Sequence, residues 1–307
     1  MKDKLVIGTR GSLLALTQAR LVERELNKIV PTVKIDLKII KTKGDMLSSS
    51  VVEVIDKSFF IKELEDSLLK EEIDIAVHSL KDMPSDLPDG LEIIAVPERD
   101  DPYDVLVSKE GDSIRSLSPE SKVGTSSLRR SSQLKRYRND LRVVPIRGNV
   151  DTRLEKLARG EVDALILASA GLKRLGKEEE IIEVLSPEIM LPSPAQGALG
   201  IEARTGDFFV SECLRPLDHF ITRSLVSVER NVMRAVEGGC RVPLAAFAEM
   251  RNDKIFLRTL LVSLDGKKIA YSEGLGELSD SEEFGGNLAS ELLNSGGDEI
   301  LSNLLEN

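Results

Sequence analysis

The sequence predicts an α/β protein: two α/β domains followed by a smaller C-terminal α+β domain with an antiparallel sheet. Three observations support this fold class. The chain has 307 residues, enough for two or three domains. Up to about residue 200, short apolar runs alternate with segments of helical periodicity, which favours mostly parallel sheets covered by helices. Beyond Pro216, strand candidates follow one another directly, as in an antiparallel sheet.

The elements of the first series follow from the spacing of apolar residues. Apolar side chains recur at helical intervals from Ala15 to Ile29, whereas residues 33–40 alternate like a strand. The predicted elements are strands over 5–7, 33–40, 73–77 and 91–96, and helices over 15–29 and 60–71. The Pro-rich segment 191–197 marks a break, and residues 200–202 are predicted to form one more strand that returns to the first domain.

The second and third series are predicted in the same way. The second has strands over 104–108, 123–125, 141–146 and 164–168, a helix from residue 128 and a helix over 150–159. The third has a helix over 219–236, strands over 244–249, 255–263 and 268–272, and a helix over 288–293. The expected domains are therefore residues 1–98 with 198–215, residues 99–197, and residues 216–307.

Composition argues against several kinds of site. Cys213 and Cys240 lack Cys-x-x-Cys spacing, which removes support for a disulfide framework or a thiolate metal site. His78 and His219 are isolated, so no metal is expected. The first residues are charged where a signal peptide needs an apolar core, and no apolar run approaches the ~18 residues of a membrane span. A cytoplasmic location is therefore expected.

Charge is distributed unevenly along the chain. The net charge is −10, yet residues 122–153 contain nine basic and two acidic residues. This local balance of +7 leaves −17 for the rest of the chain. An acidic protein with one basic segment fits a small polyanion better than a nucleic acid, which usually requires a broad basic face with stacking aromatic residues. We expect a small-molecule ligand and neither a nucleic-acid nor a membrane partner.

Three predicted strand-to-helix junctions, at residues 9–12, 124–130 and 147–153, carry hydroxyl or guanidinium groups. The first-turn amides of a helix lack intrahelical partners, and the helix dipole favours an anion there. Ordinary capping with solvated arginines would explain any one junction. Three together favour a site for carboxylates or phosphates, because guanidinium groups bind such oxyanions in a bidentate manner.

Asp82 belongs to a polar segment, residues 78–84, that follows the predicted strand over 73–77. Open α/β sheets bind ligands at the carboxyl ends of their strands. One interpretation is a surface ion pair between Lys81 and Asp82 in a turn. The other is a carboxylate that acts as a general base or stabilises positive charge in a site.

Cys240 follows two glycines and precedes Pro243, which predicts an exposed, sharply turned loop where Arg241 favours the thiolate. A buried cysteine that only fills space is the alternative, and Cys213 is expected to be structural. Residues 171–178 match a phosphate-binding P-loop at seven positions but have Glu178 where a hydroxyl must bind magnesium. No nucleotide site is therefore expected.

Seven motifs resemble those of the porphobilinogen deaminase (hydroxymethylbilane synthase) family, in order along nearly the whole chain. They are TRGS (9–12), HSLKDMP (78–84), VGTSSLRR (123–130), RGNVDTRL (147–154), AGLKRL (170–175), LPSPAQGALGIE (191–202) and EGGCRVP (237–243). The resemblance implies two periplasmic-binding-protein-like domains around a cleft and a C-terminal domain that presents Cys240. It implies a monomeric enzyme that joins four porphobilinogens head to tail with loss of ammonia and releases hydroxymethylbilane.

The resemblance also implies a dipyrromethane cofactor attached to the Cys240 sulfur as a thioether. Asp82 is then expected to stabilise the cationic azafulvene that remains when ammonia leaves, and no metal is implied. The implied cofactor-binding residues are Lys81, Thr125, Ser126, Ser127, Arg129, Arg130, Arg147 and Gly148. The implied substrate-binding residues, which hold acetate and propionate groups, are Arg10, Ser12, Lys57, Arg147, Arg153, Arg174 and Gln196.

One segment departs from the family. Residues 55–58 are Ile-Asp-Lys-Ser where the family usually has Gly-Gly-Lys-Gly, so Lys57 is kept and the glycines are lost. A stiffer loop is expected, which puts a lid role in question. The alternative function is a binding protein that only traps small anions, and Cys240 distinguishes the two because a binder has no use for an exposed thiol. A nucleic-acid-binding protein is disfavoured by the net charge and the scarcity of aromatic residues.

Overall fold

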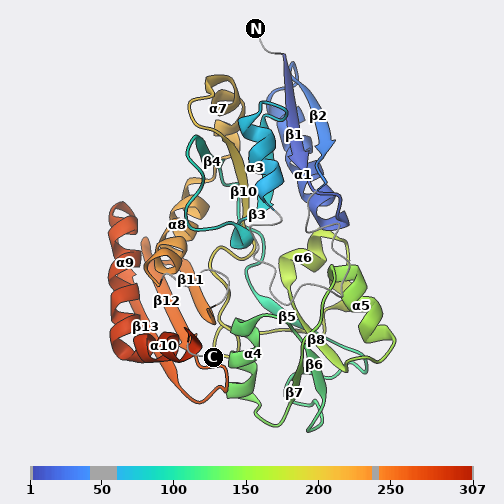
Figure 1. The fold of residues 1–307 in the computed structure, drawn as a ribbon, viewed down its shortest axis with the longest axis vertical. Coiled ribbons are helices and arrows are strands. Elements are labelled where there is room, and N and C mark those ends of the chain that lie inside the picture. The colour runs from blue at the N-terminus through green and yellow to red at the C-terminus, as the bar shows by residue number, and fades with distance from the viewer. Residues whose placement is uncertain (1–2, 42–60, 237–241, 306–307) are drawn as a thin grey trace. The chain divides into compact units, whose positions relative to one another are not determined.

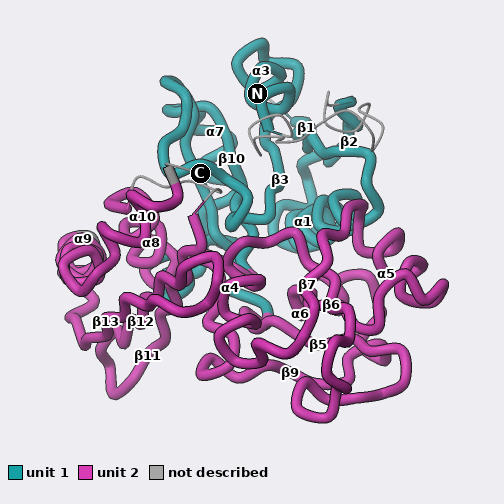
Figure 2. Tube along the Cα trace, turned by 60° about the horizontal axis from the view of Figure 1, so that its bottom comes forward, with its two compact units in different colours: residues 1–100, 198–223 teal, residues 101–197, 224–307 magenta. Residues whose placement is uncertain are grey.

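The computed structural model describes residues 3–41, 61–236 and 242–305. The chain divides into two compact units, residues 1–100 with 198–223 and residues 101–197 with 224–307, which Figure 2 shows in two colours. Unit 2 contains both the second predicted α/β series and the C-terminal strands. The three-domain boundaries stay a prediction.

Unit 1 is built on a five-stranded sheet in the order β2-β1-β3-β10-β4 (Figure 1). The strands are β1 (Lys4–Thr9), β2 (Lys34–Ile39), β3 (Ile75–Ser79), β4 (Leu91–Ala95) and β10 (Leu199–Arg204). Strand β1 is parallel to β2 and β3, whereas β10 is antiparallel to β3 and β4. The sheet is therefore mixed, with two parallel and two antiparallel pairings, whereas a mostly parallel sheet was predicted. The strand predicted over residues 200–202 lies in β10.

Helices cover both faces of this sheet. They are α1 (Leu13–Ile29), α3 (Lys62–Leu69) and α7 (Phe208–Leu214), with short 3-10 turns η2 (Leu80–Asp82) and η4 (Arg215–Leu217). Residues of α1 and α7 share one buried cluster with Ile7 and Ile201. Residues of α3 pack in another cluster with Ile73 and Ala76. Because strand side chains alternate between faces, these two clusters lie on opposite sides of the sheet.

Unit 2 contains a second five-stranded sheet in the order β7-β6-β8-β5-β9. Its strands are β5 (Asp104–Ser108), β6 (Lys122–Gly124), β7 (Arg142–Val144), β8 (Ala164–Ala168) and β9 (Glu183–Val184). Its helices are α4 (Leu128–Tyr137), α5 (Val150–Ala158) and α6 (Ser169–Arg174), followed by a 3-10 turn, η3 (Glu178–Glu180). In both five-stranded sheets, three parallel strands are followed by one antiparallel strand and an edge strand. Gly171 lies inside α6, so the near-match to a P-loop starts in a helix.

The C-terminal part of unit 2 is an antiparallel sheet in the order β11-β12-β13, as predicted (Figure 1). Its strands are β11 (Leu244–Arg251), β12 (Lys254–Val262) and β13 (Ile269–Gly276). The remaining elements are α8 (Phe220–Ala235), η6 (Leu278–Asp280), α9 (Ser281–Leu292), the turn η7 (Leu293–Gly297) and α10 (Asp298–Leu305). One face of the sheet packs on α8, α9 and α10. The predicted α/β class with a C-terminal antiparallel sheet is confirmed.

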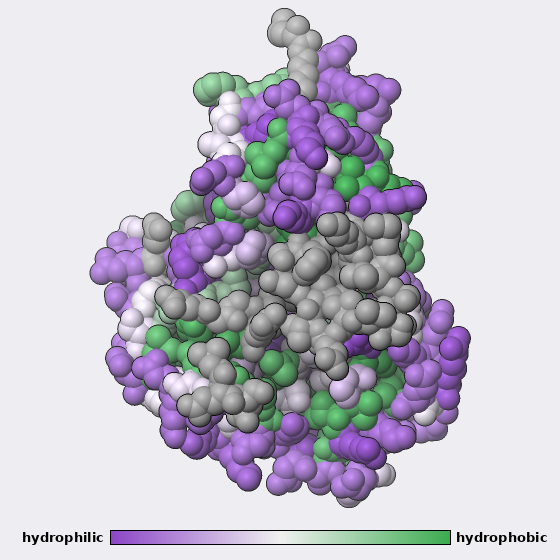
Figure 3. All heavy atoms as spheres, in the orientation of Figure 1, coloured by the Kyte–Doolittle hydropathy of each residue, from purple (hydrophilic) through white to green (hydrophobic). Residues whose placement is uncertain are grey.

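Among the described residues, no helix is both long and apolar enough to cross a membrane. On the face shown in Figure 3, most of the described surface is hydrophilic and the hydrophobic side chains are scattered. Scattered apolar side chains are normal at a water-exposed surface and require no partner.

Candidate functional site

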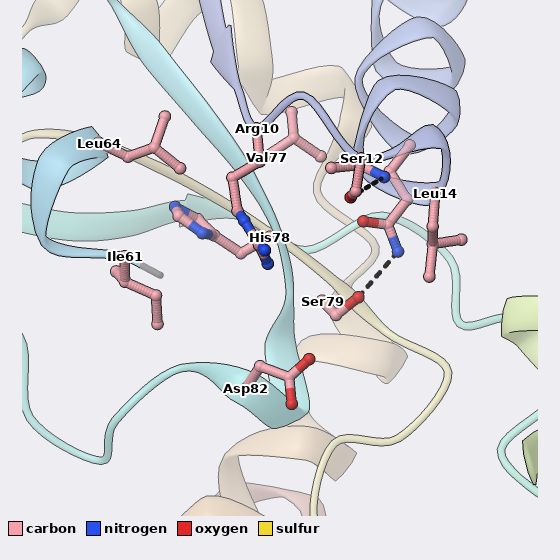
Figure 4. A pocket seen from close by; sticks show the side chains of 11 residues that line it. Arg10, Ser12, Leu14, Ile61, Leu64, Val77, His78, Ser79 and Asp82 are labelled. Atoms are coloured by element: carbon pink, nitrogen blue, oxygen red, sulfur yellow. Dashed lines mark hydrogen bonds between the residues drawn. The ribbon is translucent and has the colours of Figure 1, made fainter. Parts of the chain in front are cut away.

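The carboxyl ends of β1 and β3 lie at one edge of the unit 1 sheet, and the residues that follow them line a cavity of about 270 Å³. The polar lining residues are Arg10, Ser12, Gln18, His78, Ser79 and Asp82. The apolar lining residues are Leu14, Ala15, Ile61, Leu64 and Val77. Figure 4 shows the Arg10 guanidinium and the Asp82 carboxylate directed toward the same space. We call this cavity the unit 1 pocket.

Local structure explains why these side chains meet. Ser12 is the N-cap of α1 and accepts a hydrogen bond from the Ala15 amide at 3.3 Å, which starts the helix directly after Arg10. Gln18 Nε2 donates to Ser79 Oγ at 2.8 Å and ties α1 to the end of β3. Asp82 is the last residue of η2 and is half-buried. The predicted residues Arg10, Ser12 and Asp82 are therefore brought together in one pocket.

A second group of predicted residues lies in unit 2, at the carboxyl ends of β6 and β7. Thr125 Oγ1 accepts from the Ser127 amide at 3.2 Å, and Ser127 Oγ accepts from the Arg130 amide at 3.4 Å as the N-cap of α4. Ser126 Oγ donates to the Ile146 carbonyl at 2.7 Å and accepts from the Ile146 amide at 3.0 Å. The three hydroxyls thus hold the start of α4 against the segment after β7.

Arg129 and Arg130 are not solvated helix-end residues, because both bind the buried carboxylate of Asp104. Arg129 Nη1 lies 2.7 Å from Asp104 Oδ2, and Arg130 Nε and Nη2 lie 2.9 and 2.7 Å from Oδ1. The two arginines are 5% and 7% exposed and Asp104 is fully buried. Burial lowers the pKa of Arg129, and the attraction of Asp104 opposes that effect. Gln196 Nε2 donates to the same Oδ1 at 3.0 Å and completes this Asp104 network.

The third junction presents an exposed arginine. Gly148 has φ +111°, and a Cβ there would lie 2.7 Å from Thr152, so this turn requires glycine. Asn149 caps α5 by accepting from the Thr152 amide at 2.9 Å. Arg153 Nε donates to the Gly148 carbonyl at 2.9 Å, whereas Arg147 is exposed. The side chain of Arg147 is therefore open to solvent, unlike the buried Arg129 and Arg130 of the second junction.

The other predicted residues fall in separate places. Arg174 donates from Nη2 to the Gly197 carbonyl. Lys81 is half-buried in η2 and is not among the residues lining the unit 1 pocket. Lys57 and Cys240 lie outside the described residues. Over residues 3–41, 61–236 and 242–305, no group of three or more His, Cys, Asp or Glu residues could hold a metal ion.

The sequence interpretation missed four residues near these sites: Gln18, Glu202, Glu65 and Asp104. Two had a signal, since Glu202 interrupts the apolar run of β10 and Asp104 begins the apolar β5, and both are fully buried. An acidic residue inside an apolar strand requires a partner, which is a reason to search for one. Gln18 and Glu65 had no such signal.

Two protein-family models match most of the chain. Residues 5–212 match the family model described as "Porphobilinogen deaminase, dipyromethane cofactor binding domain", and residues 224–294 match "Porphobilinogen deaminase, C-terminal domain". Porphobilinogen deaminases of Carboxydothermus hydrogenoformans and Desulforudis audaxviator are 42% and 46% identical over 99% and 98% of this chain, and the match covers 98% of each relative.

More distant similarity extends to solved structures. One is the probable amino-acid ABC transporter extracellular-binding protein ytmK from Bacillus subtilis, with 15% identity, a TM-score of 0.42 and coverage of 70% of this chain and 92% of that one. The family models and the nearly full-length relatives decide the assignment: the chain belongs to the porphobilinogen deaminase family of enzymes.

Proposed function

We propose that this chain is an active porphobilinogen deaminase that joins four porphobilinogens head to tail with loss of ammonia and releases linear hydroxymethylbilane. The observation that carries the proposal is the unit 1 pocket, where Asp82 and Arg10 line the same cavity. A guanidinium group suits the substrate carboxylates, and a carboxylate suits the positive charge that develops as ammonia leaves. The cavity volume of about 270 Å³ is just below the roughly 300–1,000 Å³ of drug-sized ligand sites, which fits a small ligand.

The described residues fit the dipyrromethane cofactor by their donor chemistry. Such a group carries carboxylates and pyrrole N–H groups, so it requires cationic or hydroxyl donors and a carboxylate acceptor. Arg10, Ser12 and Asp82 supply both kinds in unit 1, and the exposed Arg147 supplies a donor in unit 2. When bound, the cofactor supplies the pyrrole carbon to which the first substrate is joined. Its attachment to Cys240 is part of the proposal and rests on the EGGCRVP motif.

We assign the remaining predicted residues as follows. Lys81, Thr125, Ser126, Ser127, Arg129, Arg130, Arg147 and Gly148 bind the cofactor, and Arg10, Ser12, Lys57, Arg147, Arg153, Arg174 and Gln196 bind substrate. Arg129 and Arg130 already have the Asp104 carboxylate as a partner. To bind the cofactor, they would therefore use guanidinium N–H groups that point away from Asp104. Asp82 is the catalytic residue, because it orients pyrrole N–H groups and stabilises positive charge.

Three further parts of the proposal concern organisation. We infer three domains with the boundaries predicted from the sequence, a monomer, and a cytoplasmic location. The net charge of −10 supports the absence of a nucleic-acid partner. Size-exclusion chromatography with light scattering tests the monomer, and a mass of two chains would contradict it.

The experiment that tests the function is the intact mass and activity of two cysteine variants. Cys240→Ser should fold but lack both the two-pyrrole mass increment and activity, because a hydroxyl is a far poorer nucleophile than a thiolate. Cys213→Ser is the matched control, since Cys213 is buried on α7 in the unit 1 core, and it should keep both. A parent protein without the increment and without hydroxymethylbilane formation would indicate a binding protein instead. An increment retained in Cys240→Ser would place the attachment elsewhere.

A further inference from the structure

His78 and Glu202 form a buried pair behind the unit 1 pocket. In the antiparallel register of β3 and β10, His78 lies opposite Gly200 and Glu202 lies opposite Ala76. His78 and Glu202 are therefore diagonal neighbours on the same face of the sheet, the face covered by α3. His78 Nε2 and Glu202 Oε2 are 3.0 Å apart, and the two side chains are 6% and 0% exposed.

The second oxygen of Glu202 has no hydrogen-bond partner within the described part of the chain, although it is buried. A buried carboxylate oxygen without a donor is costly unless a charge or a shared proton compensates it. The only compensation that the described contacts offer is the imidazole of His78. The hydrogen bond between Nε2 and Oε2 therefore ties the Glu202 carboxylate to the imidazole.

Glu65 on α3 belongs to the same group of charges. Burial, and next the repulsion of Glu202, raise the pKa of Glu65 to about 7, while His78 opposes the rise. The other charged groups acting on Glu65 are Asp66 and Lys62 of its own helix. The charged groups that share the pocket with His78 are Arg10 after β1 and Asp82 of η2. We call His78, Glu202 and Glu65 the proton cluster.

The proton cluster meets the pocket through His78, which is one of the lining residues (Figure 4). Glu202 Oε2 contacts the ring at Nε2, and Nδ1 of His78 makes no hydrogen bond to any described residue. In the neutral ring this arrangement favours the Nε2–H tautomer and leaves a lone pair on Nδ1. Nδ1 is then the atom of the ring that can receive a proton.

We propose that His78 is a catalytic base for chain elongation and that Glu202 is the positioning residue that fixes its tautomer. This inference rests on the proposed function. When a new C–C bond forms between an incoming porphobilinogen and the previously added substrate ring, the C–N bond of the aminomethyl group breaks and ammonia leaves. The ring carbon that forms the bond loses its hydrogen as a proton, which Nδ1 of His78 accepts. His78 then passes the proton to ammonia or to water, so that each step releases one ammonium ion in total.

The tautomer can be measured without reference to activity. The chain has two histidines, so ¹⁵N-histidine NMR of the holoenzyme with His219→Asn reports His78 alone. We expect the Nε2–H tautomer in the parent and in Glu202→Gln, whose amide oxygen can still accept from Nε2. Glu202→Leu removes the hydrogen-bond acceptor, so His78 should no longer favour the Nε2–H tautomer in this variant. A parent with the Nδ1–H tautomer, or a Glu202→Leu spectrum equal to that of the parent, would overturn the positioning role.

The base is tested by single-turnover elongation with porphobilinogen deuterated at the unsubstituted ring carbon. His78→Gln should slow elongation by about 10²–10⁴-fold and increase the isotope effect, because proton removal becomes rate-limiting. Glu212→Gln is the matched control, since Glu212 lies exposed on α7 of the same unit, and it should stay within about twofold of the parent. Unchanged elongation in a folded His78→Gln that carries the two-pyrrole increment would overturn this inference and leave the proposed function intact. A parent that makes no hydroxymethylbilane would instead contradict the proposed function.

Discussion

Asp82 is the residue on which the proposed chemistry depends most. Asp82→Asn keeps the shape of the side chain and removes the negative charge that stabilises the cationic intermediate. Elongation should fall by about 10²-fold or more while the two-pyrrole increment remains, as measured by quench-flow and intact mass. Asp86→Asn, an exposed acid in the segment after η2, serves as the control and should elongate normally. Near-normal elongation in Asp82→Asn would show that Asp82 has only a structural role in the turn and does not stabilise the cationic intermediate.

Glu65 also predicts how stability depends on pH. Its pKa is about 7 in the folded protein and ordinarily 4.5, so the folded state binds the proton more tightly than the unfolded state. Stability associated with Glu65 is fully present below pH 4.5 and is lost as the pH rises through 7. Glu65→Gln should therefore be more stable than the parent at pH 8 and equal to it near pH 4.5, as measured by urea unfolding. A difference in stability between Glu65→Gln and the parent that stays constant from pH 4.5 to pH 8 would contradict the raised pKa of Glu65.

At the scale of single elements, periodicity predicted the long helices and the strands, because each buries one face or both faces in a core. Three short helices of six to eight residues, α6, α7 and α10, were not predicted, because about two turns give only a weak periodic pattern. Helix α3, also eight residues long, was predicted. Strand β3 was predicted over 73–77 but spans Ile75–Ser79. Pairing with β10 extends it, because Ser79 lies opposite Leu199. His78 is therefore inside the strand, and its contact with Glu202, distant in sequence, could not be predicted from local pattern.

The N-terminal turns of α4 and α5 were both predicted to bind anions. Their arginines differ in burial, so substitutions in the two turns should have different effects on stability. Arg130→Leu leaves the buried Asp104 with fewer partners and should lower the free energy of unfolding by about 3 kcal/mol or more. Arg147→Leu removes an exposed guanidinium, so stability should change by less than about 0.5 kcal/mol while carboxylate binding weakens by roughly 1.5–3 kcal/mol. Urea unfolding and porphobilinogen titration measure both quantities. Equal effects of the two variants on stability would contradict the buried role of Arg130.

The C-terminal end of α4 is fixed by the hairpin between β12 and β13. Lys135 Nζ donates to the Leu264 carbonyl at 2.8 Å, and a Cβ on Gly266 would lie 2.8 Å from the Arg136 amide nitrogen. Gly266→Ala should destabilise the protein through both this contact and its φ of +79°. Gly111→Ala is a matched control, with φ +80° and nothing within 4 Å, and should cost only about 1–2 kcal/mol. If urea unfolding gave Gly266→Ala and Gly111→Ala the same loss of unfolding free energy, the hairpin could move away from α4 without a further cost in stability.

At the scale of the whole molecule, the main clusters of buried apolar side chains in the described residues each take their members from one unit. The cluster around Leu26 belongs to unit 1, and the cluster around Leu134 belongs to unit 2. The sequence predicted the apolar faces of these elements and a strand over residues 200–202 that returns to the first domain. It did not predict that β3 and β4 are the strands with which β10 pairs. Pairing between strands that are far apart in the sequence is only weakly indicated by the local pattern of residues.

Because the buried clusters of the two units are separate, a destabilising substitution in one unit should increase local opening in that unit alone. Leu26 is fully buried, and Leu26→Ala should cost about 2–5 kcal/mol because a cavity remains where the side chain packed. Hydrogen exchange followed by mass spectrometry should then accelerate in the core elements of unit 1 and remain unchanged in those of unit 2, since local opening follows cooperative units. Leu134→Ala, equally buried, is the matched variant and should give the reverse pattern. Acceleration spread evenly over both units in either variant would show that the two cores unfold as one.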